Sequence, residues 1–182
     1  MNGYVGGITT ALGRVATMLN GRVKAGTLPA VSRLGVWSAL VSLLMERFVD
    51  GITQVKKCTV PGRGLMTLDA GHIFAAALRL GPTSLAHLSR DKGYVDSYVS
   101  AFYFDNDGDL LQWMLRNKAQ YRLGHMRALL EIGIGGSMKR SKLREVKAAL
   151  EAMYLVPAPP PASGSGPLLG GASSLLGGFG KA

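Results

Sequence analysis

Three features of the sequence predict an all-α fold, an irregular bundle of about six helices. Apolar residues recur at spacings of three and four along several segments, as they do on the buried face of a helix. Stretches containing Gly and Pro separate these segments. Hydrophobic residues make up 47% of the 182 residues and charged residues 18%, a balance typical of a globular domain with a substantial core.

The first two helices are expected in residues 4–24 and 34–57. The second is the better defined, because a single apolar stripe follows it from end to end. The stripe consists of Leu34, Trp37, Val41, Leu44, Phe48, Ile52 and Val55. Glu46, Arg47 and Asp50 fall on another face, which we expect to be in contact with solvent.

Pro61 and Gly62 are expected to break the chain before a third helix in residues 65–80. Residues 82–92 indicate a connector. Residues 94–102 carry apolar pairs at helical spacing and are predicted to form a short helix, although the same residues are rich in strand formers.

The sequence DNDGD at residues 105–109 predicts a turn whose Asn or Asp caps the next helix. A calcium loop is excluded because Tyr103 and Met114 would occupy its first and twelfth positions, where carboxylates are needed. An apolar run over residues 111–130 ends at several glycines, and a last helix is expected in residues 138–155.

These elements suggest three segments. Residues 1–27 form an N-terminal helix, which would also suit the end of a longer rod. Residues 28–156 form the main helical domain. Residues 157–182 are rich in Pro, Gly and Ser and are predicted to be disordered, because such a composition buries too little apolar surface to fold.

Charge and cysteine content limit the function. The formal net charge of +10 favours acidic partners such as an anionic membrane, nucleic acid or an acidic protein surface. Cys58 is the single cysteine, which excludes an internal disulfide and a cysteine-based zinc site. The uncharged apolar run at residues 34–45 is too short to span a bilayer, which needs about 20 residues. A soluble protein without a secretory signal is expected.

No residue pattern indicates catalysis, a metal site or a cofactor. His72, His87 and His125 are dispersed and lack the spacing of a metal motif, so surface or partly packed histidines are expected. The segment 62–64, Gly-Arg-Gly, lacks the spacing of a phosphate loop and follows a helix rather than a strand. The chain is expected not to be an enzyme. The candidate contact for a partner or an anionic surface is the cation cluster Lys56, Lys57 and Arg63.

Four blocks resemble the C-terminal domain of syndetin, the subunit that distinguishes the endosome-associated recycling protein (EARP) tethering complex. They are VKKC at Val55–Cys58, GRGLMTLD at Gly62–Asp69, YVDSYVSAFYF at Tyr94–Phe104 and the helix around Trp113. The similarity covers residues from about 28 to 153. The order of the blocks matches the family, with a single-residue insertion in the turn at residues 105–109.

The resemblance implies the C-terminal helical-rod end of a vesicle-tethering subunit without catalytic activity or cofactor. Its partners would be other tethering-complex subunits and SNARE proteins, in endocytic recycling of cargo to the plasma membrane. It would lie in the cytoplasm, peripheral on recycling endosomes or trans-Golgi-associated membranes. Members of the family are much longer and carry an N-terminal coiled-coil region, so this chain is expected to be a fragment or a short form.

Two other functions are compatible with the positive charge. The first is a peripheral domain that binds anionic lipid directly, which predicts binding that needs acidic lipid and is lost at high salt. The second is binding to nucleic acid. It is the weaker alternative, because the basic last helix carries no interleaved aromatic residues on which bases could stack, and no nucleic-acid partner is expected.

Overall fold

The computed structural model describes residues 2–56, 58–82, 85–133 and 138–155. Within these residues the chain forms seven α-helices and one short 3₁₀ helix, and no strand, which confirms the all-α prediction. The helices are α1 (Gly3–Lys24), α2 (Ala30–Ile52), α3 (Val60–Leu80), α4 (Leu85–Ser100), α5 (Asp107–Asn117), α6 (Leu123–Ile132) and α7 (Arg140–Leu155), and the 3₁₀ helix η1 is Ala101–Tyr103. The predicted tail from residue 157 lies outside the described residues.

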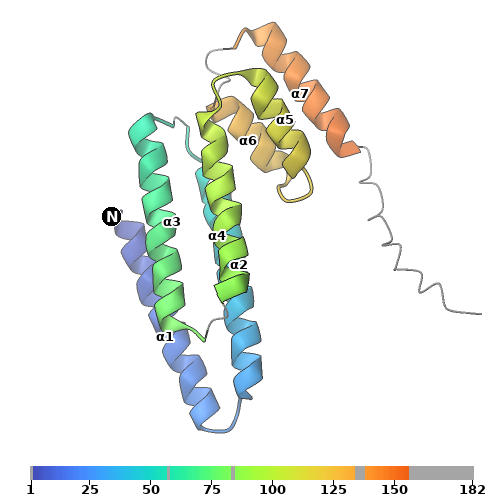
Figure 1. Ribbon diagram of the computed structural model, residues 1–182. Helices are drawn as coiled ribbons and strands as arrows, with labels where there is room; N and C mark the ends of the chain where they lie inside the picture. Colours follow the sequence, from blue (N-terminus) through green and yellow to red (C-terminus); the bar gives the residue numbers. More distant parts are fainter. Residues whose placement is uncertain (1, 57, 83–84, 134–137, 156–182) are drawn as a thin grey trace, which may run out of the picture.

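Helices α1 to α4 run alternately down and up and form an elongated bundle (Figure 1). The most extensive packing is between α2 and α4, α1 and α3, and α3 and α4. Helices α5, α6 and α7 gather at the end of the bundle where α2 and α4 finish (Figure 1). The first helix therefore packs within the domain, against α3 and α2.

The core of the bundle is built on α2. Its buried stripe is Trp37, Val41, Met45, Val49 and Ile52, and the indole of Trp37 is fully enclosed. The predicted stripe was correct at Trp37, Val41 and Ile52, but it did not include the buried Met45 and Val49. Its predicted members Leu44 and Phe48 are only partly buried and Leu34 is exposed.

The end of α3 meets α2 at a close contact. A Cβ atom added to Gly81 would lie 1.8 Å from Nε1 of Trp37. A side chain at this position is therefore incompatible with the buried indole. Gly81 follows α3 directly, so this contact fixes the level on α2 at which the turn between α3 and α4 lies.

Several predicted boundaries were wrong. Helix α2 ends at Ile52, so Lys56 lies beyond it. Pro61 lies inside the first turn of α3, where a missing N–H costs nothing. Thr59 caps this helix by accepting a hydrogen bond of 3.2 Å from the Gly62 amide. The proposed connector at residues 82–92 largely belongs to α4.

The capping turn before α5 was predicted correctly. The Asn106 side chain accepts a hydrogen bond of 2.8 Å from the Asp109 amide, so the turn serves the backbone of the helix. The apolar run over residues 111–130 is two helices rather than one, because α5 ends at Asn117 and α6 begins at Leu123.

Candidate interaction surfaces

The predicted cation cluster lies where α2 connects to α3. Lys56 is exposed in this loop, and none of the ion pairs among the described residues involves it. Arg63 is half-buried in the first turn of α3, and its guanidinium lies 5.0 Å from the ring centroid of Tyr103. Lys57 lies outside the described residues. The structure therefore gives Arg63 a neighbour within the fold and leaves Lys56 at the surface. The role of this cluster in binding stays a prediction.

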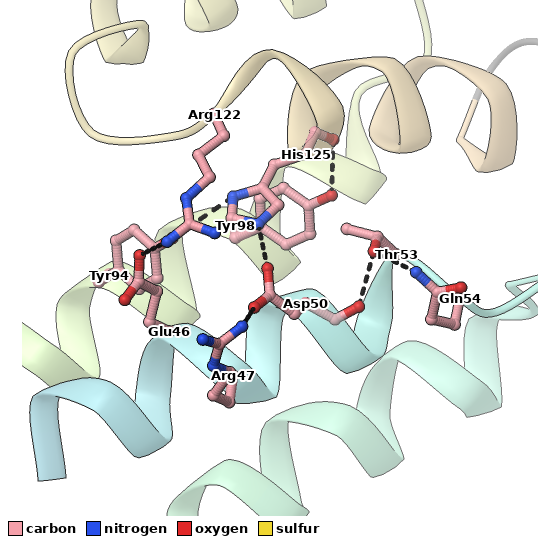
Figure 2. A network of polar contacts seen from close by, with 9 residues as sticks. All are labelled: Glu46, Arg47, Asp50, Thr53, Gln54, Tyr94, Tyr98, Arg122 and His125. Atoms are coloured by element: carbon pink, nitrogen blue, oxygen red, sulfur yellow. Dashed lines mark hydrogen bonds and ion pairs between the residues drawn. The ribbon is translucent and has the colours of Figure 1, made fainter. Parts of the chain in front are cut away.

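A polar network joins α6 to α2 and α4 (Figure 2). His125 is 4% exposed, and its Nε2 atom lies 2.7 Å from Oδ1 of Asp50. The hydroxyl of Tyr98 donates a hydrogen bond of 2.7 Å to the His125 carbonyl. The imidazole and carbonyl of His125 thus connect α6 to Asp50 on α2 and to Tyr98 on α4 at one point.

Charged groups at the edge of this network complete it. Arg122, which precedes α6, pairs with Glu46, and Arg47 lies 3.0 Å from the second carboxylate oxygen of Asp50. The hydrogen bond from His125 lowers the pKa of Asp50, with smaller contributions from Arg47 and Arg122. The carboxylate is therefore held in its charged form.

Aromatic rings extend the same junction. Tyr94 and Tyr121 stack with centroids 4.6 Å apart, and the Tyr121 hydroxyl donates a hydrogen bond of 2.6 Å to the Tyr94 carbonyl. The Tyr154 hydroxyl of α7 donates to the Tyr121 carbonyl over 2.8 Å. Burial raises the pKa of Tyr94, Tyr98 and Tyr121, so all three hydroxyls stay protonated at neutral pH.

The sequence did not reveal this junction. His125 was expected at the surface or partly packed, and it is buried. Glu46 and Asp50 were assigned to a solvent-exposed face, but both bind residues of the α6 region. One signal was available: acids are scarce in this basic chain, and two of them, Glu46 and Asp50, lie one helical turn apart on the same helix.

A groove of about 730 Å³ lies between α2 and α4. Leu43, 49% exposed, stands at its edge, and the partly buried Tyr94 also lines it. Within it, the Ser42 hydroxyl donates a hydrogen bond of 2.7 Å to the buried carboxylate of Asp91. The groove combines apolar side chains with the polar groups of Glu46, Arg90 and Gln120, a lining that can receive side chains from another helix.

A second cavity of about 530 Å³ lies between α1, α2 and α3. Asp69 lines it, is 1% exposed and accepts hydrogen bonds from the Tyr4 hydroxyl at 2.6 Å and the Asn2 amide at 2.5 Å. Burial raises the pKa of Asp69, but these two hydrogen bonds outweigh it and lower the pKa. Burial and the neighbouring carboxylate raise the pKa of Tyr4 to about 12. Asp69 thus connects α3 to the start of α1.

In the described ranges, no group of three or more His, Cys, Asp or Glu side chains is arranged to hold a metal ion. His72 is exposed on α3. None of the described helices combines the length and the apolar character that crossing a membrane requires.

Comparison with known proteins gives one consistent relationship. The family model described as "Syndetin, C-terminal" matches residues 1–151. Syndetin of Gallus gallus is 25% identical over 150 residues, which cover 82% of this chain and 15% of the relative. Syndetin of Mus musculus is 25% identical over 116 residues, 64% of this chain and 12% of the relative. The chain thus spans a small part of these relatives. No solved structure matches.

Proposed function

The chain belongs to the syndetin C-terminal family, and from this membership we propose that it is a non-enzymatic interaction domain of an endosomal vesicle-tethering complex. It acts in endocytic recycling of cargo to the plasma membrane and in SNARE-dependent vesicle fusion. Its partners are other subunits of the tethering complex and SNARE proteins. It works in the cytoplasm, peripheral on recycling endosomes or trans-Golgi-associated membranes.

The observation that carries this proposal is the family match over residues 1–151, which includes α1 to α6 and most of α7. The fold supports it, because a helical bundle with grooves between helices offers surfaces on which partner helices can pack. The exposed Lys56 gives a contact for an acidic partner.

Affinity purification followed by mass spectrometry tests the proposal. The tagged chain is expressed in cells alone and fused to a family-type N-terminal coiled-coil region. Recovery of tethering subunits only with the fusion would make the chain a terminal domain that assembles through that region. Recovery of SNARE proteins by the chain alone would locate a docking surface on the helices described above. If neither form recovers trafficking proteins above a tag-only control, the proposal is wrong.

A matched pair of variants tests the predicted contact. If a partner binds Lys56 through an acidic group, Lys56→Glu should reduce recovery of that partner at least fivefold. The substitution replaces an attraction between opposite charges by a repulsion. Lys139→Glu makes the same charge change at an exposed site just before α7 and serves as the control. Equal recovery by both variants would show that Lys56 does not contact the partner. The proposal of a tethering role would still stand.

A further inference from the structure

The turn between α1 and α2 projects beyond the rest of the bundle (Figure 1). We call residues 17–36 the α1–α2 tip. The contact between Gly81 and Trp37 marks where the turn from α3 to α4 lies against α2. Residues 30–36 of α2 continue past this level for about 10 Å, at 1.5 Å per residue. In this part α1 and α2 cover each other, and α3 has already ended.

The α1–α2 tip carries positive charge without any acid. Arg22, Lys24 and Arg33 lie within it, and the first acidic residue of the whole chain is Glu46. Elsewhere cations are partly neutralised, as Arg127 is by Glu151. No such neutralisation is available within the tip. Its field therefore attracts anionic partners over roughly the 8–10 Å of a Debye length at physiological salt.

Apolar side chains are exposed among these cations. Val31 is 77% exposed, Met18 51% and Val36 47%. Val31 lies in the first turn of α2, close to Leu28 and Pro29 in the connecting turn. Contact with a partner would remove the apolar surface of these residues from water, which favours association.

Hydrogen bonds give the tip a defined shape. The Arg22 carbonyl accepts hydrogen bonds from the Thr27 amide at 3.0 Å, the Leu28 amide at 3.2 Å and the Thr27 hydroxyl at 3.1 Å. Gly26 adopts a φ of +70°, which closes the turn. Arg33 donates a hydrogen bond to Asn20, so the two helices are also joined by side chains. The cations and the apolar residues are therefore presented together.

We propose that the α1–α2 tip binds the surface of an anionic phospholipid bilayer. Val31 and its apolar neighbours enter the interface, and Arg22 and Lys24 contact lipid phosphates and acidic headgroups. A projecting end that carries both exposed apolar side chains and cations fits the flat, deformable surface of a bilayer. This contact is separate from the Lys56 cluster and does not depend on assembly of a tethering complex.

Other occupants fit the tip less well. A second copy of the chain would bring two acid-free tips together, and their charges repel. A nucleic acid would gain phosphate contacts but no stacking, because residues 17–36 include no aromatic side chain. An anionic bilayer offers contacts to both groups: acidic headgroups for the cations and the membrane interface for the exposed apolar residues.

Vesicle co-sedimentation with the full chain tests the proposal. The vesicles contain phosphatidylcholine alone or with about 30% phosphatidylserine. We expect binding only with the acidic lipid and weaker binding at higher salt. Arg22→Gln combined with Lys24→Gln should lower the partition coefficient roughly 25-fold, about fivefold per cation near the surface. Val31→Ser should lower it about fivefold if roughly 40 Å² of its apolar surface leaves water on binding.

Two double variants of equal charge change serve as controls. Lys139→Gln with Arg140→Gln removes two exposed cations at α7, and Arg116→Gln with Arg144→Gln removes one exposed cation from α5 and one from α7. Both should keep binding within threefold of the wild type. Circular dichroism of every variant checks that it is folded.

Three results would overturn the proposal. The first is no binding to acidic vesicles by the wild type. The second is a loss in either control as large as that of the tip variant, which would indicate diffuse attraction or a different site. The third is a single-stranded oligonucleotide that binds through Arg22 and Lys24 and displaces the chain from vesicles, which would assign the tip to nucleic acid.

Discussion

The two ends of α2 differ in how many of their side chains find partners within the fold. Toward its C-terminal end, Glu46 and Asp50 are bound by Arg122 and His125 from the α6 region. Toward its N-terminal end, beyond Trp37, the helix has no acid and leaves Val31 exposed. One end has its polar and apolar groups matched within the fold. The other end leaves apolar side chains exposed beside the cations of the turn between α1 and α2. The two ends therefore differ in how many of their side chains have partners within the fold.

The largest effect is expected at the boundary between the two ends. Gly81→Ala should destabilise the domain by about 3 kcal/mol, because its Cβ would lie 1.8 Å from the enclosed Trp37 ring. Chemical denaturation followed by far-UV circular dichroism measures the change. Gly71→Ala is the matched control, since a Cβ there meets nothing within 4 Å and should stabilise α3 by about 0.5–1 kcal/mol. Similar stability of the two variants would mean that Gly81 does not set this level of the bundle.

A smaller loss is expected at the matched end of α2. Asp50→Ala should cost about 2 kcal/mol at pH 7, because it leaves the buried His125 without its carboxylate partner. Arg47→Gln removes only an exposed partner of the same carboxylate and should cost less than about 0.5 kcal/mol. Urea denaturation of both variants compares them. Equal losses would show that burial of His125 adds nothing to the pair.

The pH dependence of this difference follows from the lowered pKa of Asp50. A carboxyl group whose pKa is lower in the folded state contributes stability above its unfolded pKa, which is 3.8. That contribution is lost as the pH falls through the lower folded value. The stability gap between the wild type and Asp50→Ala should therefore be complete at about pH 5 and narrow below about pH 3.8. A gap that grows between pH 5 and pH 3 would contradict the assigned sign.

At the other end of α2, the shape of the tip can be changed without altering its charge. Gly26→Ala should destabilise the domain by about 1 kcal/mol, because φ is +70° and an alanine is strained there. Gly21→Ala, within α1 and with free space around it, should be neutral or stabilising. Thermal unfolding of the two variants measures the difference. Equal stability would mean that the turn has no fixed conformation.

The sequence predicted the parts of this structure that depend on neighbours along the chain. Helical spacing predicted the all-α fold, and the DNDGD motif predicted the cap by Asn106. The junction could not be predicted, because the contact between Asp50 and His125 joins residues 75 positions apart. The same reason applies to Arg63, whose neighbour Tyr103 lies on η1. Pro61 was misplaced because proline is tolerated in the first turn of a helix as well as in a break.

The smallest effect is expected where Lys147 of α7 pairs with Glu131 of α6. Glu131→Gln removes the partner of Lys147 and should cost about 0.3 kcal/mol at low salt, with no cost at 0.5 M salt, because the pair is exposed. Denaturation at both salt concentrations measures it. The vesicle affinity of this variant should be unchanged if Lys147 lies outside the membrane contact. An increase as large as the loss in the tip variant would place α7, rather than the α1–α2 tip, against the membrane.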